Sequence, residues 1–117
     1  LVDTADDGAF VFANLVEFDS EYGHRRDPHG YAGHLAWFDA QLGAILPRLR
    51  PDDLLIVTAD HGNDPTWPGT DHTREQVPVL VHGLGARALG QLNFVDVAAS
   101  IAAHLNVDYD GKGQSFL

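Results

Sequence analysis

The sequence predicts an α/β fold in which a mostly parallel sheet is flanked by helices. Three observations indicate this class: an apolar segment at Ala9–Phe18, an amphipathic pattern that begins at Asp27, and a second apolar segment at Leu54–Thr58. Strand, helix and strand in this order form a βαβ unit, whose crossover is nearly always right-handed and whose strands are therefore parallel neighbours. A further strand at Val77–Val81 and a helix at Phe94–Leu105 complete the expected core.

Both expected helices have start signals. Asp27 and Pro28 stand where an N-cap and a first helical residue belong, and Asn93 is a matching cap for the second helix. His104 lies near the negative end of that second helix dipole. Apolar residues then follow Pro28 at alternating spacings of four and three, which indicates an amphipathic helix. They are Tyr31, Leu35, Phe38, Leu42, Ile45 and Leu49.

The strands are predicted from apolar runs. AFVFANLVEF at residues 9–18 suits a strand buried on both faces, and LLIVT and VPVLV suit two shorter strands. Between these two lies Ala59–Gln76, which has no periodicity and is rich in proline and glycine around Trp67. Ordered loops of this length are frequently functional, so we expect functional residues here.

Composition limits the classes of partner. The chain has 117 residues, of which 44% are hydrophobic, and we expect one partial domain over residues 1–117. A net charge of −10 argues against nucleic acid or an anionic membrane as partner. The absence of cysteine excludes disulfides and thiolate metal sites and is compatible with a cytoplasmic location. No apolar run is long enough to span a bilayer.

Carboxylates and imidazoles follow the predicted strands. Asp19 and His24 come after the first strand, Asp60 and His61 after the second, and His72 lies in the long loop. Ligands of open α/β sheets bind outside the carboxyl ends of the strands, so these groups are expected to converge. A single Asp or His in a loop is more often a turn former or a surface group. The joint pattern favours a divalent metal site, with manganese, iron or zinc preferred over calcium.

Two segments of the chain carry longer motifs: VEFDSEYGHRRDP at Val16–Pro28 and TADHGNDPTWPGTDHTREQVPVL at Thr58–Leu80. They resemble phosphopentomutase, a two-metal phosphoryl-transfer family of the alkaline-phosphatase superfamily. The string ADHG is shared across the superfamily, including cofactor-independent phosphoglycerate mutases, whereas DPTWPGTDHTRE is the phosphopentomutase version. The resemblance covers nearly the whole chain and implies a partial alkaline-phosphatase-like core.

The resemblance also implies two divalent metal ions, expected to be Mn²⁺. Asp19, His24 and His72 would hold one ion, and Asp60 and His61 would hold the second. The family completes the second site with an Asp near its amino terminus and a Thr that carries the phosphoryl group, and neither segment is recognisable here. No threonine of this chain is therefore assigned as the nucleophile. The cap domain and the amino-terminal core segment are also missing, so we expect a carboxyl-terminal part of the enzyme that is inactive alone.

The function implied is that of a cytoplasmic isomerase of nucleotide and pentose phosphate metabolism. It would interconvert ribose or deoxyribose 1-phosphate and 5-phosphate through a phosphothreonine, with no nucleic-acid or membrane partner. Two alternatives stay open: another mutase or phosphodiesterase of the superfamily, or a non-catalytic metal-binding remnant.

Polar neighbours of the expected ligands have two interpretations each. Arg25, Arg26 and Arg74 either direct a guanidinium at phosphate oxygens or form ion pairs that fix the loop, and we favour the ion pairs. Asp64 and Asp71 either accept hydrogen bonds from the N–H groups of ligating histidines or act as turn residues. The sequence does not separate these last two roles.

Overall fold

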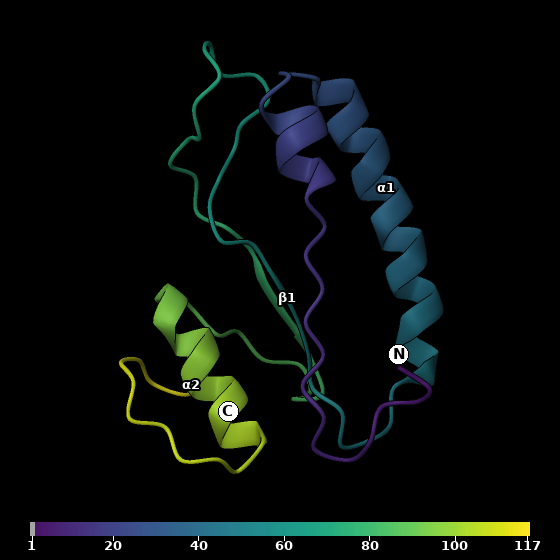
Figure 1. Cartoon of the computed structure of the whole chain (residues 1–117), viewed down its shortest axis with the longest axis vertical. Coiled ribbons are helices and arrows are strands. Elements are labelled where there is room, and N and C mark those ends of the chain that lie inside the picture. The colour runs from purple at the N-terminus through teal and green to yellow at the C-terminus, as the bar shows by residue number, and fades with distance from the viewer. Residues whose placement is uncertain (1) are drawn as a thin grey trace. The chain divides into compact units, whose positions relative to one another are not determined.

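The computed structural model describes residues 2–117, which form two compact units. One unit comprises residues up to Arg50 together with Thr58–Pro78, and the other comprises Pro51–Val57 with Val79–Leu117. The prediction of a single partial domain over residues 1–117 stays a prediction. In chain order the elements are η1 (Phe18–Gly23), α1 (Pro28–Ile45), η2 (Leu46–Arg48), β1 (Leu55–Thr58), β2 (Val79–His82) and α2 (Phe94–His104) (Figure 1).

Helix α1 begins where the sequence predicts. Asp27 is its N-cap and accepts a hydrogen bond from the backbone N–H of Gly30 at 2.9 Å, and Pro28 is the first helical residue. The last turn tightens into the 3₁₀ helix η2, which contains Pro47. Proline cannot donate the i→i−4 hydrogen bond, which accounts for the change of helix type. Among the described residues, no helix combines the length and the hydropathy that a bilayer span requires.

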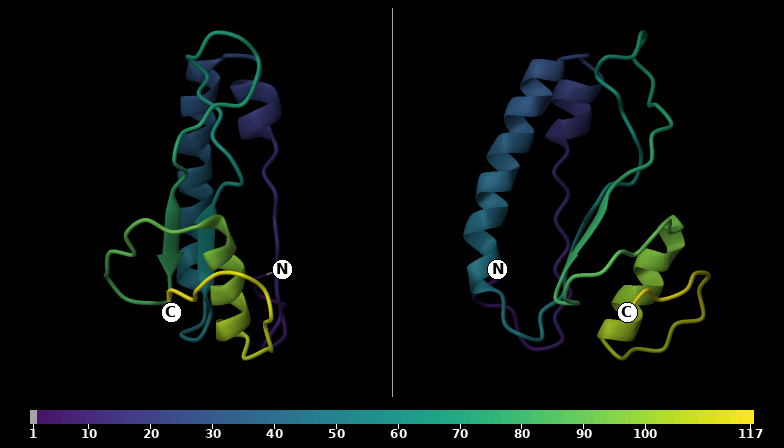
Figure 2. Two further views of the ribbon diagram at one scale, coloured as in Figure 1. Left: turned by 90° about the vertical axis from the view of Figure 1, so that its left-hand side faces the viewer. Right: turned by 180° about the vertical axis from the view of Figure 1, so that it is seen from behind.

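The six-residue π-helix η1 packs on α1 through aromatic rings. The ring centroid of Phe18 lies 4.6 Å from that of His34 and 5.3 Å from that of Tyr31. Phe38 adds an edge contact at 6.2 Å, and Tyr22 lies 5.2 Å from His34. Tilted and edge-on aromatic pairs at these distances are favourable. The contacts hold η1 against the first half of α1. Figures 1 and 2 show the two helices side by side.

The strand predicted at Ala9–Phe18 is wrong. Residues 9–15 have no strand pairing in the described chain, and η1 already begins at Phe18 (Figure 1). Their apolar side chains are largely exposed, with Phe10 at 60% and Phe12 at 77%. A strand is defined by hydrogen bonds to a neighbouring strand, and apolar composition alone does not supply that neighbour. The backbone carbonyl of Val16 instead accepts from Ser20 N at 2.9 Å and starts the helical turn.

The sheet consists of β1 and β2, which run antiparallel. The strands predicted at Leu54–Thr58 and Val77–Val81 are therefore confirmed, with ends shifted by a residue or two. The α/β class is also confirmed, but a mostly parallel sheet is not. The physical reason is the connection: the long loop returns the chain directly, as the antiparallel bridge between Gly62 and Thr73 shows.

Helix α2 and the carboxyl-terminal residues are joined by buried polar groups. The carboxylate of Asp96 accepts from Asn93 N at 2.8 Å, completing a capping box, and from Gln114 N at 2.9 Å. Ser100 is fully buried; its hydroxyl donates to the Asp96 carbonyl at 2.7 Å and accepts from Phe116 N at 3.0 Å. The predicted helix is confirmed with its cap. The buried apolar side chains of the described residues lie on the same helix: Ala99 and Ala102.

The carboxylate of Asp96 makes the stability of this unit depend on pH. Hydrogen bonds from the N–H groups of Gln114 and Asn93 hold the pKa of Asp96 below its ordinary value of 3.8, although burial acts in the opposite direction. A group with a lower pKa in the folded chain stabilises the fold above its unfolded pKa, and this contribution is lost as the pH falls through the folded pKa. We therefore expect Asp96→Asn to destabilise the unit at neutral pH, and the difference from wild type to shrink below about pH 4.

Urea unfolding followed by circular dichroism at neutral and acidic pH measures this difference. Asp110→Asn, at an exposed position of the same unit, is the control and is expected to change little. A destabilisation by Asp96→Asn that stays constant from neutral to strongly acidic pH would contradict the assignment.

Candidate metal centre

The π-helix η1 places Asp19 and His24 on the same side. In an α-helix, residues five apart lie about 140° apart around the axis, so their side chains diverge. The i→i+5 bonding of a π-helix instead brings them into register. His24 N donates to the Asp19 carbonyl at 2.8 Å in this pattern, and His24 Nε2 lies 3.4 Å from Asp19 Oδ2. The change of helix type therefore creates this pair.

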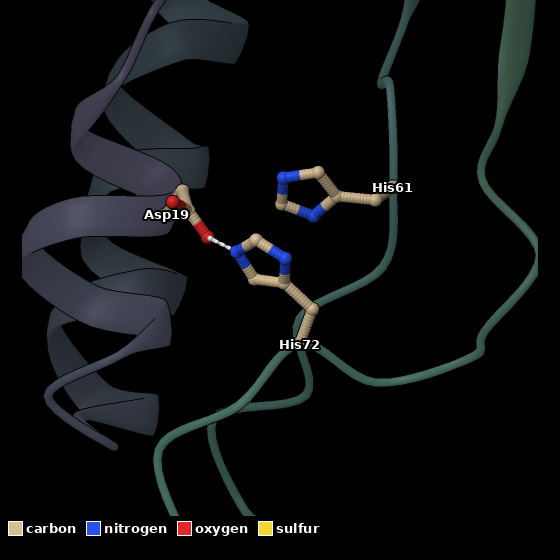
Figure 3. Close-up of side chains that lie close together, drawn as sticks. All are labelled: Asp19, His61 and His72. Carbon is tan, nitrogen blue, oxygen red and sulfur yellow. Dashed lines mark ion pairs between the residues drawn. The ribbon is translucent and has the colours of Figure 1, made fainter.

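The loop after β1 brings two more imidazoles to Asp19. His72 Nε2 lies 3.3 Å from Asp19 Oδ1, and the His61 ring stacks on the His72 ring with centroids 3.7 Å apart. Figure 3 shows both imidazoles extending from the loop toward the carboxylate on η1. One donor atom from each of these three residues lies within 4.8 Å of the others, a spacing that one metal ion could bridge.

His24 joins this cluster, whereas Asp60 stands at its margin. His24 Nε2 is 3.0 Å from His72 Nε2. The Asp60 side chain is 77% exposed, and its Oδ2 lies 3.7 Å from His61 Nε2. The structure thus brings four of the five expected ligands together and leaves the fifth beside His61. How the five divide between two ions stays a prediction, and the structure groups His61 with Asp19 and His72.

Backbone carbonyls set the tautomers of two histidines. His24 Nδ1 is hydrogen-bonded to the carbonyl of Thr70, and His61 Nδ1 to the carbonyl of Gly62 at 3.2 Å. A carbonyl only accepts, so each Nδ1 carries the proton, and in the neutral ring Nε2 keeps its lone pair. Both Nε2 atoms are thereby prepared to bind a cation, which is the usual arrangement around ligating histidines.

Asn63 belongs to the site but was not predicted from the sequence. Its amide donates to Asp19 Oδ1 at 2.6 Å. Burial alone would raise the pKa of Asp19, but this hydrogen bond and the nearby imidazoles of His24, His72 and His61 lower it overall. A carboxylate with a low pKa is present in the ionised form that metals bind. The available signal was the position of Asn63, two residues after an expected ligand, since amides commonly orient ligating carboxylates.

The three arginines lie in different environments. Arg25 forms an exposed ion pair with Glu21 at 2.8 Å. Arg26 donates to backbone carbonyls of the loop, such as that of Asp64 at 2.7 Å, and to the Asn63 side chain. Arg74 is exposed. Arg74 is part of the loop that carries the histidines, and Arg26 contacts this loop from the end of η1.

Asp64 and Asp71 are both part of the loop and form hydrogen bonds there. Asp64 Oδ1 accepts from the backbone N–H of Thr66 at 2.8 Å and from its hydroxyl at 2.7 Å, which closes a turn. These two bonds, the backbone one first, lower the pKa of Asp64 against a small opposing effect of burial. Asp71 offers its backbone carbonyl to Arg26 at 2.6 Å. The structure thus gives Asp64 a turn-forming contact.

Comparison with known proteins places this site in a family. Residues 2–109 match the metalloenzyme superfamily. The chain belongs to the metalloenzyme superfamily. That membership accords with a cluster of one carboxylate and three imidazoles, because members of this superfamily bind divalent metals.

Curated relatives of the chain are named phosphopentomutase. The chain is 56% identical over 117 residues to the protein of Methylobacterium radiotolerans, covering 97% of this chain and 29% of the relative. For a protein of Methylorubrum extorquens the identity is 58% over 113 residues, covering 94% and 28%. For Chromohalobacter salexigens it is 54% over 123 residues, covering 99% and 29%. The predicted resemblance to phosphopentomutase is confirmed, and the chain spans less than a third of these relatives.

Gly23 gives Asn63 the room to reach Asp19. A Cβ at this buried position would lie 2.5 Å from Asn63 Nδ2 and 2.9 Å from the carbonyl oxygen of Phe18. We expect Gly23→Ala to displace the amide and to destabilise the chain by about 1–3 kcal/mol, as overpacking typically does. Thermal and urea unfolding measure the change.

Gly43→Ala on α1 is the matched control, because nothing lies within 4 Å of a Cβ built there. Alanine is favoured over glycine inside a helix, so this variant is expected to stabilise the chain by about 0.5–1 kcal/mol. The two substitutions are identical in chemistry and should have opposite signs. Equal effects would show that Gly23 has no special packing role.

Proposed function

We propose that the chain supplies metal-binding residues for phosphoryl transfer of the phosphopentomutase type. In this proposal the complete enzyme interconverts ribose or deoxyribose 1-phosphate and 5-phosphate. The observation that carries it is the donor cluster of Asp19, His61 and His72, in a chain that is 56% identical over 117 residues to a protein named phosphopentomutase. Small pentose phosphates are the substrates proposed, in the cytoplasm, without nucleic acid or membrane as partner.

The donor set suits first-row divalent cations. One carboxylate and three imidazoles, without thiolate, are the ligand types of manganese, iron and zinc sites, and Mn²⁺ is the ion we propose. His24 and His61 already direct an unprotonated Nε2 toward the cluster. His72 Nε2 lies 3.0 Å from His24 Nε2, which has no proton, so in the metal-free chain His72 Nε2 is the donor that links the two rings. Binding a cation through His72 Nε2 therefore requires the tautomer of this ring that carries its proton on Nδ1.

The balance of charge also suits a phosphate ester. A pair of divalent cations supplies charge neutralisation and a clamp for the attacking and leaving oxygens of the phosphoryl group. Neutral imidazoles bind a cation without subtracting from its charge, whereas each carboxylate removes one unit. With Asp19 as the carboxylate inside the cluster, the site would keep net positive potential for the substrate.

The division between two ions follows the family resemblance. We propose that Asp19, His24 and His72 serve one ion and that Asp60 and His61 serve the other. The exposed Asp60 carboxylate, beside His61, is in a position to complete a second set with residues from outside this chain. The nucleophilic threonine is proposed to lie outside it too, so the chain alone is expected not to turn over substrate.

Removing one imidazole tests the metal site. We expect His72→Ala to weaken Mn²⁺ or Co²⁺ binding to the chain by at least about tenfold, since losing even an outer-sphere partner typically costs about 10–100-fold. Isothermal titration calorimetry measures the affinity. His29→Ala, which removes an exposed imidazole from α1, is the control and should leave the affinity unchanged. If both variants bind as the wild type does, the cluster is not the metal site.

A chimera tests the activity. We expect the chain alone, with Mn²⁺, to show no interconversion of ribose 1-phosphate and 5-phosphate. Substituted for the matching segment of the Methylobacterium radiotolerans phosphopentomutase, it should sustain activity within about tenfold, a change of about 1.4 kcal/mol in the barrier. The His72→Ala chimera should lose that activity. A folded, metal-loaded chimera without mutase activity would refute the proposed reaction and favour a different substrate or a non-catalytic remnant.

A further inference from the structure

Arg26, which follows η1, directs its side chain at the loop that carries the histidines. Five acceptors lie within hydrogen-bonding distance of its guanidinium: one of Nε, three of Nη1, whose two hydrogens they share, and one of Nη2. Three are backbone carbonyls of the loop, one is the amide oxygen of Asn63, and one is the carbonyl that ends η1. In order these are the carbonyls of Gly69, of Asp64 at 2.7 Å and of Asp71 at 2.6 Å, then Asn63 Oδ1 at 2.7 Å, and the Gly23 carbonyl at 3.1 Å.

We propose that Arg26 is a positioning residue, which holds the His72 segment and the Asn63 amide in the geometry that presents Asp19 to a metal ion. The proposal rests on the proposed function of the site. It also assigns the guanidinium a role other than phosphate binding, because each of its three nitrogens already donates to a protein acceptor.

The first part of this role concerns the amide of Asn63. An amide side chain has one accepting and one donating end. Since Arg26 occupies the oxygen, the NH₂ group must face Asp19 Oδ1, which it reaches at 2.6 Å. Without Arg26 the amide would be held through its NH₂ end alone, by Asp19, and its oxygen would lose the donor that fixes its position. Arg26 thus fixes the orientation of the group that orients the proposed ligand.

The second part concerns the segment before His72. Arg26 holds the carbonyls of Gly69 and Asp71, and His24 Nδ1 holds that of Thr70 between them. The segment has no regular secondary structure and its residues are exposed. Fixing each backbone residue costs about 1–2 kcal/mol of conformational entropy. An anchor present before the metal arrives removes this cost from the binding step, which is the effect of preorganisation.

The backbone conformation at position 26 does not itself require arginine, so the reason for arginine lies in its side chain. Arg26 has φ of 55°, in the left-handed region. Glycine and asparagine adopt this conformation more readily than a long side chain does, so the turn alone would favour them. Arg26→Asn is therefore the best variant, because asparagine tolerates the left-handed backbone of the turn and lacks the guanidinium.

The experiment compares Arg26→Asn with Arg25→Asn, which removes the neighbouring guanidinium from its exposed ion pair with Glu21. Hydrogen–deuterium exchange of the metal-free chain follows residues 62–73. Co²⁺ titration follows affinity and the visible spectrum of the bound ion. We expect Arg26→Asn to speed exchange in the loop and to weaken Co²⁺ binding by about 10–100-fold with an altered spectrum. Arg25→Asn should match the wild type.

Equal Co²⁺ affinity in the two variants would overturn the proposal, even if the loop exchanged faster in Arg26→Asn. Arg26→Lys keeps the charge but lacks the planar fork, and it is expected to retain the fold while restoring little of the affinity. Full rescue by lysine would show that only the charge matters. If the wild type bound no Co²⁺, the proposed function would fail, and the exchange comparison would then decide whether Arg26 orders the loop.

Asn63→Ala separates the two parts of the role. It removes the amide but leaves the carbonyl contacts of Arg26, so loop exchange should stay near the wild-type rate while Co²⁺ affinity falls. An unchanged affinity would eliminate the part of the proposal that runs through the amide.

Discussion

The hydrogen bonds between the η1–α1 junction and the long loop are the interactions on which the metal cluster depends. Asp19 and His24 come from the junction, whereas His61 and His72 come from the loop, on the far side of α1 in the sequence. Among the described residues, the loop contains one isolated β-bridge, between Gly62 and Thr73. Side-chain hydrogen bonds that join the two segments therefore keep the carboxylate and the three imidazoles in contact.

The π-helix solves a separate geometric problem. Two ligands five residues apart point in different directions from an α-helix, and a strand alternates its side chains so that they point to opposite faces. A π-helical turn aligns them while remaining anchored to α1 by Phe18 and Tyr22. Such turns are rare and often occur at functional sites, which agrees with the place of η1 beside the cluster. The π-helical backbone of η1 is thus what places the Asp19 and His24 side chains next to each other.

The sequence predicts the elements whose signals are local. Asp27 and Pro28 start α1, and Asn93 starts α2, because capping depends on residues a few positions apart. Residues 9–16 mislead because a strand needs a distant partner that composition does not reveal. The expected ligands are identified by their motif, whereas the sequence gives Asn63 only a position two residues after His61, and the fold places its amide against Asp19. The same holds for Arg26, whose acceptors are mainly backbone carbonyls and therefore leave no mark on the sequence.

The exposed apolar segment has a consequence for handling the protein. Residues 9–16, AFVFANLV, contain no charge and no proline, and most of their large side chains face solvent. Such a stretch has backbone donors and acceptors outside any sheet beside apolar side chains, the combination from which intermolecular β-pairing starts. The net charge of −10 opposes this through repulsion between copies, and salt screens that repulsion. Concentrated samples in high salt are therefore the condition in which this chain would begin to aggregate.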